Sequence, residues 1–265
     1  MKRIWGFVLG GAVMAVGGGT TLSACAHDDS TLFVQSVLAP QLVTPGTGCV
    51  YTNDPTQPFL SSGVLDVALR PTYDASYLLA NQLVPRGDPT APQTETSYIN
   101  IQGAVVRIND SMGNQLRTFT RLGSVVIDPA QGTTPGLAPF VGLTIVDEMT
   151  IANLGTINPG DVKRLVVYTK FFGDTLGGEY VESDDYEFPV DVCNQCLISF
   201  SAGDINDSCT SPNCFGNASA SATPPQIPCD YEDYAVDCIA CKSFAAACDP
   251  AAVCLGALDA GANGQ

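Results

Sequence analysis

Two pairs of cysteines are spaced for thiol chemistry. Cys193 and Cys196 form one Cys-x-x-Cys motif, and Cys238 and Cys241 form another. Such a pair supplies half of a tetrathiolate zinc site, or the two sulfurs of a thioredoxin-like redox centre. No βαβ pattern surrounds either motif, and further cysteines crowd both. We therefore expect structural disulfides, with zinc binding and redox chemistry as the alternatives.

Histidine chemistry is restricted to one position near the start of the chain. His27 is the only histidine, and it lies in a short polar stretch two residues after Cys25. A Ser-His-Asp or Cys-His catalytic site, or a histidine-liganded metal, is therefore excluded from the rest of the sequence.

Carboxylates are the remaining candidates for catalysis. A glycosidase needs only two acids at a set separation, and Asp184, Asp185 and Glu187 lie close together in the sequence. The acidic face of a solvated strand explains the same residues better. We therefore expect a non-catalytic protein, and we keep a carboxylate-based surface hydrolase acting on glycans as the alternative.

Two groups of oxygen-bearing side chains leave calcium binding open. The first is Glu182, Asp184 and Asp185, and the second is Asp204, Asn206 and Asp207. Neither group has the EF-hand spacing with a glycine at the sixth position of the loop. We therefore assign no metal and no cofactor.

The first 25 residues carry the most specific pattern in the chain. Lys2 and Arg3 precede an apolar run at 4–16, which is too short to span a bilayer, and small residues follow at 17–21. After the small residues comes Leu22-Ser23-Ala24-Cys25, which resembles the lipobox of bacterial lipoproteins. The resemblance implies cleavage before Cys25, a diacylglycerol on its sulfur and a fatty acid such as palmitate on its amino group. In that family an aspartate after the cysteine favours the inner membrane, so Ala26 implies the outer membrane.

A lipid anchor and a strongly negative charge together limit the partners. Two or three acyl chains hold a protein stably on a membrane. Loss of Lys2 and Arg3 leaves 11 − 2 = 9 basic residues against 27 acidic ones, a formal charge of −18. Nucleic acids and anionic headgroups both require clustered Lys and Arg. We expect a membrane contact through the lipid, an envelope protein as the possible partner, and no nucleic acid.

The other cysteines predict a disulfide framework. Lipidation of Cys25 leaves ten cysteines of 11, an even number that indicates five disulfides in an exported protein. We expect Cys49 to bond to Cys193 or Cys196, which follow the last expected strand, and the rest to form four bridges among themselves. The ten are Cys49, Cys193, Cys196, Cys209, Cys214, Cys229, Cys238, Cys241, Cys248 and Cys254.

Period-two hydrophobic patterns between residues 32 and 190 predict strands about every ten residues. Leu32–Leu38 is the first, and a second begins at Gly63 with Leu65, Val67 and Leu69 inward. The apolar parity changes after Ile101 at Gly103, which predicts a β-bulge there. The later expected strands are 77–84, 117–121, 124–128 and 140–146, the last with Val141, Leu143 and Ile145 on one face, and a hairpin of 164–172 with 180–190.

These strands, without helical patterns between them, predict an all-β fold, an immunoglobulin-like antiparallel β-sandwich. The likeness is architectural, because the only tryptophan, Trp5, lies in the signal sequence. We divide the chain into a signal peptide (1–24), a lipidated tether (25–30), the sandwich (31–200) and a disulfide-rich, partly helical C-terminal segment (201–265). Its expected helices span 231–248 and 249–258. The expected function is a binding or structural role at the outer membrane, facing the periplasm or the cell surface, with a thiol-disulfide oxidoreductase as a further alternative.

Overall fold

Two β-sheets form the body of the protein. The structure is a computed structural model, and it describes residues 31–42, 49–87, 95–199, 232–241 and 245–248. The first sheet has the order β4-β1-β6-β9, formed by Phe59–Leu60, Leu32–Leu38, Tyr73–Asn81 and Gly136–Val146. The second has the order β5-β12-β10-β7-β8, formed by Gly63–Asp66, Tyr186–Cys193, Val162–Thr175, Ile99–Asp110 and Gln115–Ile127. A further strand, β11 (Tyr180–Glu182), pairs with β10.

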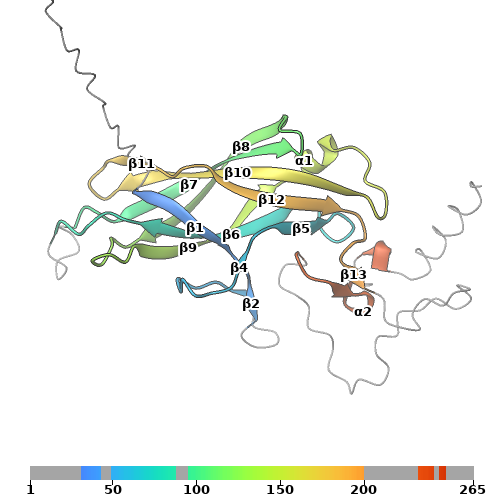
Figure 1. The fold of residues 1–265 in the computed structure, drawn as a ribbon, viewed down its shortest axis with the longest axis horizontal. Helices are drawn as coiled ribbons and strands as arrows, with labels where there is room; N and C mark the ends of the chain where they lie inside the picture. Colours follow the sequence, from blue (N-terminus) through green and yellow to red (C-terminus); the bar gives the residue numbers. More distant parts are fainter. Residues whose placement is uncertain (1–30, 43–48, 88–94, 200–231, 242–244, 249–265) are drawn as a thin grey trace, which may run out of the picture.

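The two sheets face each other across one hydrophobic core (Figure 1). Aromatic rings from opposite sheets meet there. Tyr77 of β6 and Phe140 of β9 lie 5.1 and 5.3 Å from the ring centroid of Phe171 of β10. The hydroxyl of Tyr77 also lies 2.9 Å from the hydroxyl of Thr169, so a buried hydrogen bond joins the sheets. The expected all-β fold is confirmed as two packed, mainly antiparallel sheets.

Strong alternation places β10 and β12 within the hairpin region that the sequence predicts. In β10, residues alternate between buried and partly exposed from Leu165 to Thr175. Its hairpin with β12 pairs Leu165 with Val190 and Val167 with Phe188, which puts the apolar sides of both strands into the core. The first strand, β1, has the predicted bounds.

Two glycines mark bulges, and the sequence reveals only one of them. At Gly103 the register of β7 shifts against both neighbouring strands, which confirms the predicted bulge. At Gly142 the backbone has a φ of 71°, and the register of β9 against β6 shifts between Ala75 and Tyr77. The prediction that Val141 faces inward is therefore wrong: Val141 is 55% exposed.

Three other predicted elements differ in the structure. β5 ends at Asp66, and the chain then turns, so Val67 and Leu69 lie in a turn instead of a strand. Backbone hydrogen bonds to the Asp66 carbonyl from residues 69 and 70 close that turn. The two short strands expected at 117–121 and 124–128 are one strand, β8, with an irregularity opposite Gly103.

A short helix and a parallel strand pair interrupt the antiparallel pattern. Helix α1 (Glu148–Asn153) follows β9, and Asp147 is its N-cap, accepting a hydrogen bond from the amide of Thr150. β5 runs parallel to β12, the strand beside it. The sequence expectation of antiparallel strands without helices is wrong at these two places.

The described part of the C-terminal segment packs at one end of the sandwich (Figure 1). β13 (Ile198–Ser199) pairs in parallel with β14 (Val236–Asp237), which leads into α2 (Cys238–Cys241) and a 3-10 turn (Ala246–Cys248). Cys238, Cys241 and Cys248 form a small buried cluster, and Leu69 of the sandwich packs against it. Within its described residues, the helix expected over 231–248 is limited to α2 and this turn.

Several predictions concern residues that the structure does not describe. These are the signal sequence and tether through Ser30, the helix expected at 249–258, and the second oxygen cluster, Asp204, Asn206 and Asp207. Cys25, Cys209, Cys214, Cys229 and Cys254 also lie outside the described residues.

A two-stranded sheet, β2 (Gln41–Leu42) with β3 (Cys49–Val50), adjoins the sandwich. Among the described residues, no helix has the length and apolar character needed to cross a bilayer.

Candidate functional site

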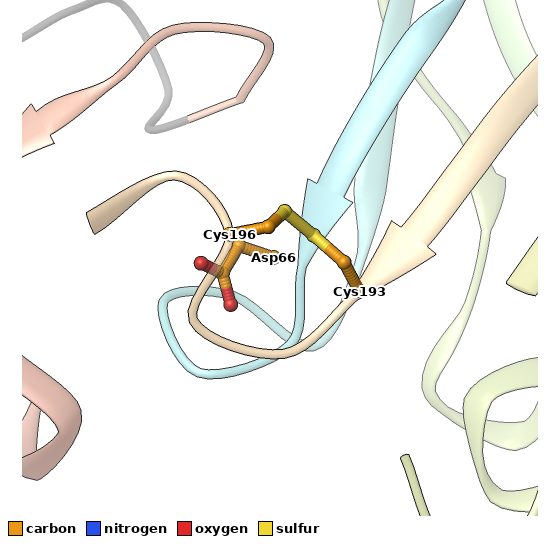
Figure 2. A group of neighbouring side chains, drawn as sticks. All are labelled: Asp66, Cys193 and Cys196. Carbon is orange, nitrogen blue, oxygen red and sulfur yellow. A yellow bond between two sulfur atoms is a disulfide. The ribbon is translucent and has the colours of Figure 1, made fainter. Parts of the chain in front are cut away.

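One of the two Cys-x-x-Cys motifs lies where β5 and β12 end together. The parallel register places Cys193 opposite Asp66, and both are buried. Cys193 and Cys196 are joined by a disulfide, and Cys196 is exposed (Figure 2). In the described part of the chain, these three residues are the one group whose potential metal ligands lie within 4.8 Å of one another.

The Asp66 carboxylate holds the Cys193–Cys196 loop in place. One oxygen accepts hydrogen bonds from the amides of Ala68 at 3.0 Å and Gln195 at 2.8 Å. The other accepts one from the amide of Leu197 at 2.9 Å. Gln195 has a φ of 62°, a left-handed conformation that is uncommon for a residue other than glycine. Asp66 thus ties the turn after β5 to the loop after β12 and supports a strained residue in that loop.

These contacts favour a structural disulfide over thiol or metal chemistry. A metal ion would have to compete with three amides for the Asp66 oxygens. Reduction followed by ionisation would place a thiolate beside a buried carboxylate, and like charges in a poorly solvated site repel strongly. Both effects disfavour the reduced, ligand-binding form of the pair.

The disulfides differ from the expected pairing. Cys193 is bonded to Cys196, and Cys241 is bonded to Cys248. Cys49 and Cys238 each take part in a disulfide as well. The prediction that Cys49 bonds to Cys193 or Cys196 is therefore wrong, because those two cysteines satisfy each other within one short loop. The second motif does not close on itself, because Cys241 pairs with Cys248.

A second cluster, which we call the acidic cluster, joins the C-terminal segment to the sandwich. It consists of Arg70, Tyr73, Asp74, Glu232 and Asp233. Glu232 accepts a hydrogen bond from the Asp74 amide at 3.1 Å and pairs with the Arg70 guanidinium at 3.0 Å. Asp233 accepts from the hydroxyl of Tyr73 at 2.8 Å. Two consecutive acids thus reach into the end of the sandwich, close to where the two sheets meet.

Burial perturbs the titration of the acidic cluster. Burial raises the pKa of Glu232 to about 9, against the lowering effect of Arg70. Burial likewise raises the pKa of Asp233 to about 6, against hydrogen bonds from the Val64 amide and Tyr73. The pKa of Tyr73 is raised well above its ordinary value by burial and by the neighbouring Asp233 charge. These residues were not predicted from the sequence, because an acidic run at 230–233 resembles a solvated surface.

The carboxylates predicted from the sequence lie on the surface around the start of β12. Asp184, Asp185 and Glu187 are exposed, and Asp185 accepts a hydrogen bond from Arg107 at 2.7 Å. Glu182 pairs with Lys170 at 2.6 Å, and this hydrogen bond is the main cause that lowers the pKa of Glu182. Glu182 and Asp185 each pair with a basic side chain, which fits the interpretation of a solvated strand face.

A shallow hollow of about 400 Å³ lies between β8, β9 and α1. At its edge Asp147 accepts hydrogen bonds from Thr150 and pairs with Arg117 at 3.0 Å and Arg121 at 3.6 Å. Partial burial raises the pKa of Asp147, but the Thr150 hydrogen bonds and both arginines outweigh it, so the net pKa is lowered. The acid is thus occupied as a helix cap. The hollow is lined by Thr72, Arg121, Thr144, Asp147, Glu148 and Met149.

Comparison with known proteins adds no relative to this geometry. A scan against protein-family models found no matching family, and searches of curated proteins and of solved structures found no match.

Proposed function

We propose that this chain is a non-catalytic lipoprotein of the cell envelope. A lipid on Cys25 anchors it at the outer membrane, facing the periplasm or the cell surface, and its sandwich has a binding or structural role. The observation that carries the proposal is the ordered series of a basic start, a short apolar run and Leu22-Ser23-Ala24-Cys25. A protein anchored in this way needs no spanning segment, because two or three acyl chains are sufficient.

The use of charged groups in the described domain supports a non-catalytic role. The Asp66 carboxylate accepts three amides, and Asp147 caps a helix. Asp191 forms a two-point pair with Arg164, with both distances 2.7 Å. Each of these contacts has a structural purpose. The proposal includes an immunoglobulin-like type of sandwich, supported by two facing, mainly antiparallel sheets.

The anchor is tested by replacing the acylated cysteine. Cys25→Ala removes the only sulfur available in the lipobox, so we expect loss of fatty-acid labelling and either release from membranes or accumulation of the unprocessed precursor. Cells are grown with an alkyne-tagged palmitate, and washed membranes are compared with the soluble fraction. Ser23→Ala, which keeps the cysteine, is the control. An unchanged membrane fraction for Cys25→Ala, or a mature N-terminus other than Cys25, contradicts the proposal.

The membrane and the partner are tested separately. Ala26→Asp is expected to move the protein from the outer to the inner membrane on a density gradient, as the lipoprotein resemblance implies. Crosslinking in intact envelopes, followed by purification of the wild-type chain, tests for an envelope protein partner. Turnover of glycans that is lost in Asp184→Ala or Glu187→Ala would instead support the hydrolase.

A further inference from the structure

Asp233 fastens the C-terminal segment to the edge of β5. The carboxylate of Asp233 accepts a hydrogen bond from the Val64 amide at 2.6 Å, and the Asp233 amide donates to the Val64 carbonyl at 3.2 Å. Asp233 therefore covers both backbone groups of Val64 along the edge of β5. It does so in a left-handed conformation, with a φ of 62°, that aspartate tolerates better than most residues.

The neighbouring acid reaches the other sheet. Glu232 is 4% exposed and accepts a hydrogen bond from the amide of Asp74 in β6. The pair therefore holds one strand from each sheet, β5 through Asp233 and β6 through Glu232. Beyond it, β14 and the cysteine cluster continue the docked segment. Residues 232 and 233 are consequently the contact through which the segment meets both layers.

Among the described residues, one cation lies beside these acids. Arg70 is the cation that faces Glu232, and it is shared with Asp74, whose carboxylate lies 2.7 Å from the same guanidinium. The hydroxyl of Tyr73 faces Asp233, and Tyr234 and Tyr51 also lie near the pair. The adjoining cavity measures about 10 Å³, which is room for about one water molecule. Glu232 and Asp74 thus share one guanidinium, and Asp233 faces a neutral hydroxyl and an amide, in a nearly dry site.

We infer that Glu232 and Asp233 form a pH-dependent latch, which holds the cysteine-rich segment against both sheets in acid and weakens as the pH rises. Release uncovers the edge of β5 at Val64. The inference is independent of the lipid anchor, because it concerns only contacts within the folded part.

The direction of the pH dependence follows from the difference between the pKa values of the two acids when docked and when exposed to solvent. Exposed, the two groups titrate near their ordinary pKa values of 4.5 and 3.8, whereas docked the pKa is about 9 for Glu232 and about 6 for Asp233. Groups whose pKa is raised on docking favour the docked state fully below their exposed values and lose that contribution as the pH rises through the docked values. Between pH 6 and 9 Glu232 alone lowers the docking equilibrium constant by up to about tenfold per pH unit.

Two backbone amides report the latch directly. The Val64 amide donates to Asp233 and the Asp74 amide donates to Glu232, so both exchange with solvent when the latch opens. Hydrogen exchange of the full mature chain, with disulfides intact, is measured from pH 5 to 8.5 and corrected for the intrinsic pH dependence of exchange. We expect the protection factors of both amides to fall by at least about tenfold from pH 6 to 8.5. Amides in the centre of β10, such as Val167, are expected to keep theirs.

Neutral substitutions assign the effect to the two acids. Glu232→Gln is expected to remove the pH dependence above pH 6. Asp233→Asn is expected to remove the contribution of Asp233 below pH 6, where Glu232 still contributes. Glu187→Gln, which alters an exposed acid of β12, is expected to retain the wild-type profile. The wild-type titration decides the inference even if a variant docks poorly. Protection of Val64 and Asp74 that stays constant overturns it, as does protection that rises with pH, the behaviour expected if the ion pair with Arg70 dominated.

Discussion

Replacing Asp66 by Asn tests whether one buried carboxylate organises the end of the sandwich. The substitution keeps the shape of the side chain and removes its charge. Asp66 accepts three amide hydrogen bonds, from Ala68, Gln195 and Leu197. The single oxygen of Asn can still accept two of them, while its amino group faces the third amide as a second donor.

The size of the effect follows from these contacts. A hydrogen bond to a charged group contributes about 1.5–3 kcal/mol, and leaving a buried donor unpaired costs about 1–3 kcal/mol. Removing the charge also removes the cost of burying it, which offsets part of the loss. We therefore expect Asp66→Asn to lower the free energy of unfolding by ~2–4 kcal/mol. At a typical urea dependence of about 2 kcal/mol per molar, the unfolding midpoint falls by about 1–2 M.

The assay is equilibrium urea unfolding at pH 7 with all disulfides oxidised. The matched control is Asp191→Asn, which removes an acid of the adjacent strand whose partner, Arg164, is 60% exposed. Exposed ion pairs contribute about 0–1 kcal/mol, so its midpoint should change little. If Asp66→Asn lies within about 0.5 kcal/mol of the wild type, the three hydrogen bonds do not hold this junction together, and the reasoning is refuted.

Two further substitutions test the close approach of β10 to β7 beside the bulge at Gly103 and the helix cap. In Gly173→Ala the new Cβ would overlap the carbonyl oxygen of Asn100 on β7, so we expect the free energy of unfolding in urea to fall by ~2–3 kcal/mol. The control is Gly178→Ala, which is strained by its φ of 82° but lies in open space and should cost only ~1 kcal/mol. Equal losses in the two variants would contradict the overlap. Asp147→Ala removes the N-cap of α1 and should cost ~1–2 kcal/mol at pH 7. Because the pKa of Asp147 is lowered on folding, its contribution to stability is present above its ordinary pKa of 3.8 and is lost as the pH falls through the folded value. The stability difference between Asp147→Ala and the wild type should therefore shrink at pH 3. An equal difference at pH 3 and pH 7 would refute this.

Local sequence signals were sufficient for the strands that alternate clearly. In β12, Glu187 and Asp191 alternate with buried apolar residues, and β10 is rich in β-branched and aromatic residues, so a hairpin of the two strands could be predicted. The bulge at Gly103 was visible for the same reason, since polar neighbours on both sides show the change of face. At Gly142 the run from Phe140 to Val146 is apolar on both faces except for Thr144, so the same change of face left no trace.

Long-range contacts decided the two clusters at the end of the sandwich. Asp66 alternates with Leu65 and Val67, which predicts a solvent-facing side chain, yet its amide partners include residues 129 and 131 positions away. Glu232 and Asp233 meet partners 158 to 169 positions away. No local pattern encodes such a meeting, because burial of a polar group depends on which distant donors the fold brings to it.

The sequence by itself determined the β class and the strand periodicity, and it carries the pattern ending at Cys25 from which we propose export. Each of these depends on residues within about 25 positions of one another. The tertiary structure alone decided which cysteines pair and which acids are buried. Cys193 has the close neighbour Cys196 and the distant candidate Cys49, and composition cannot choose between them, whereas the tight loop after β12 places Cys196 within bonding distance. Pairing and burial are properties of positions in space, and only the packed sheets define those positions.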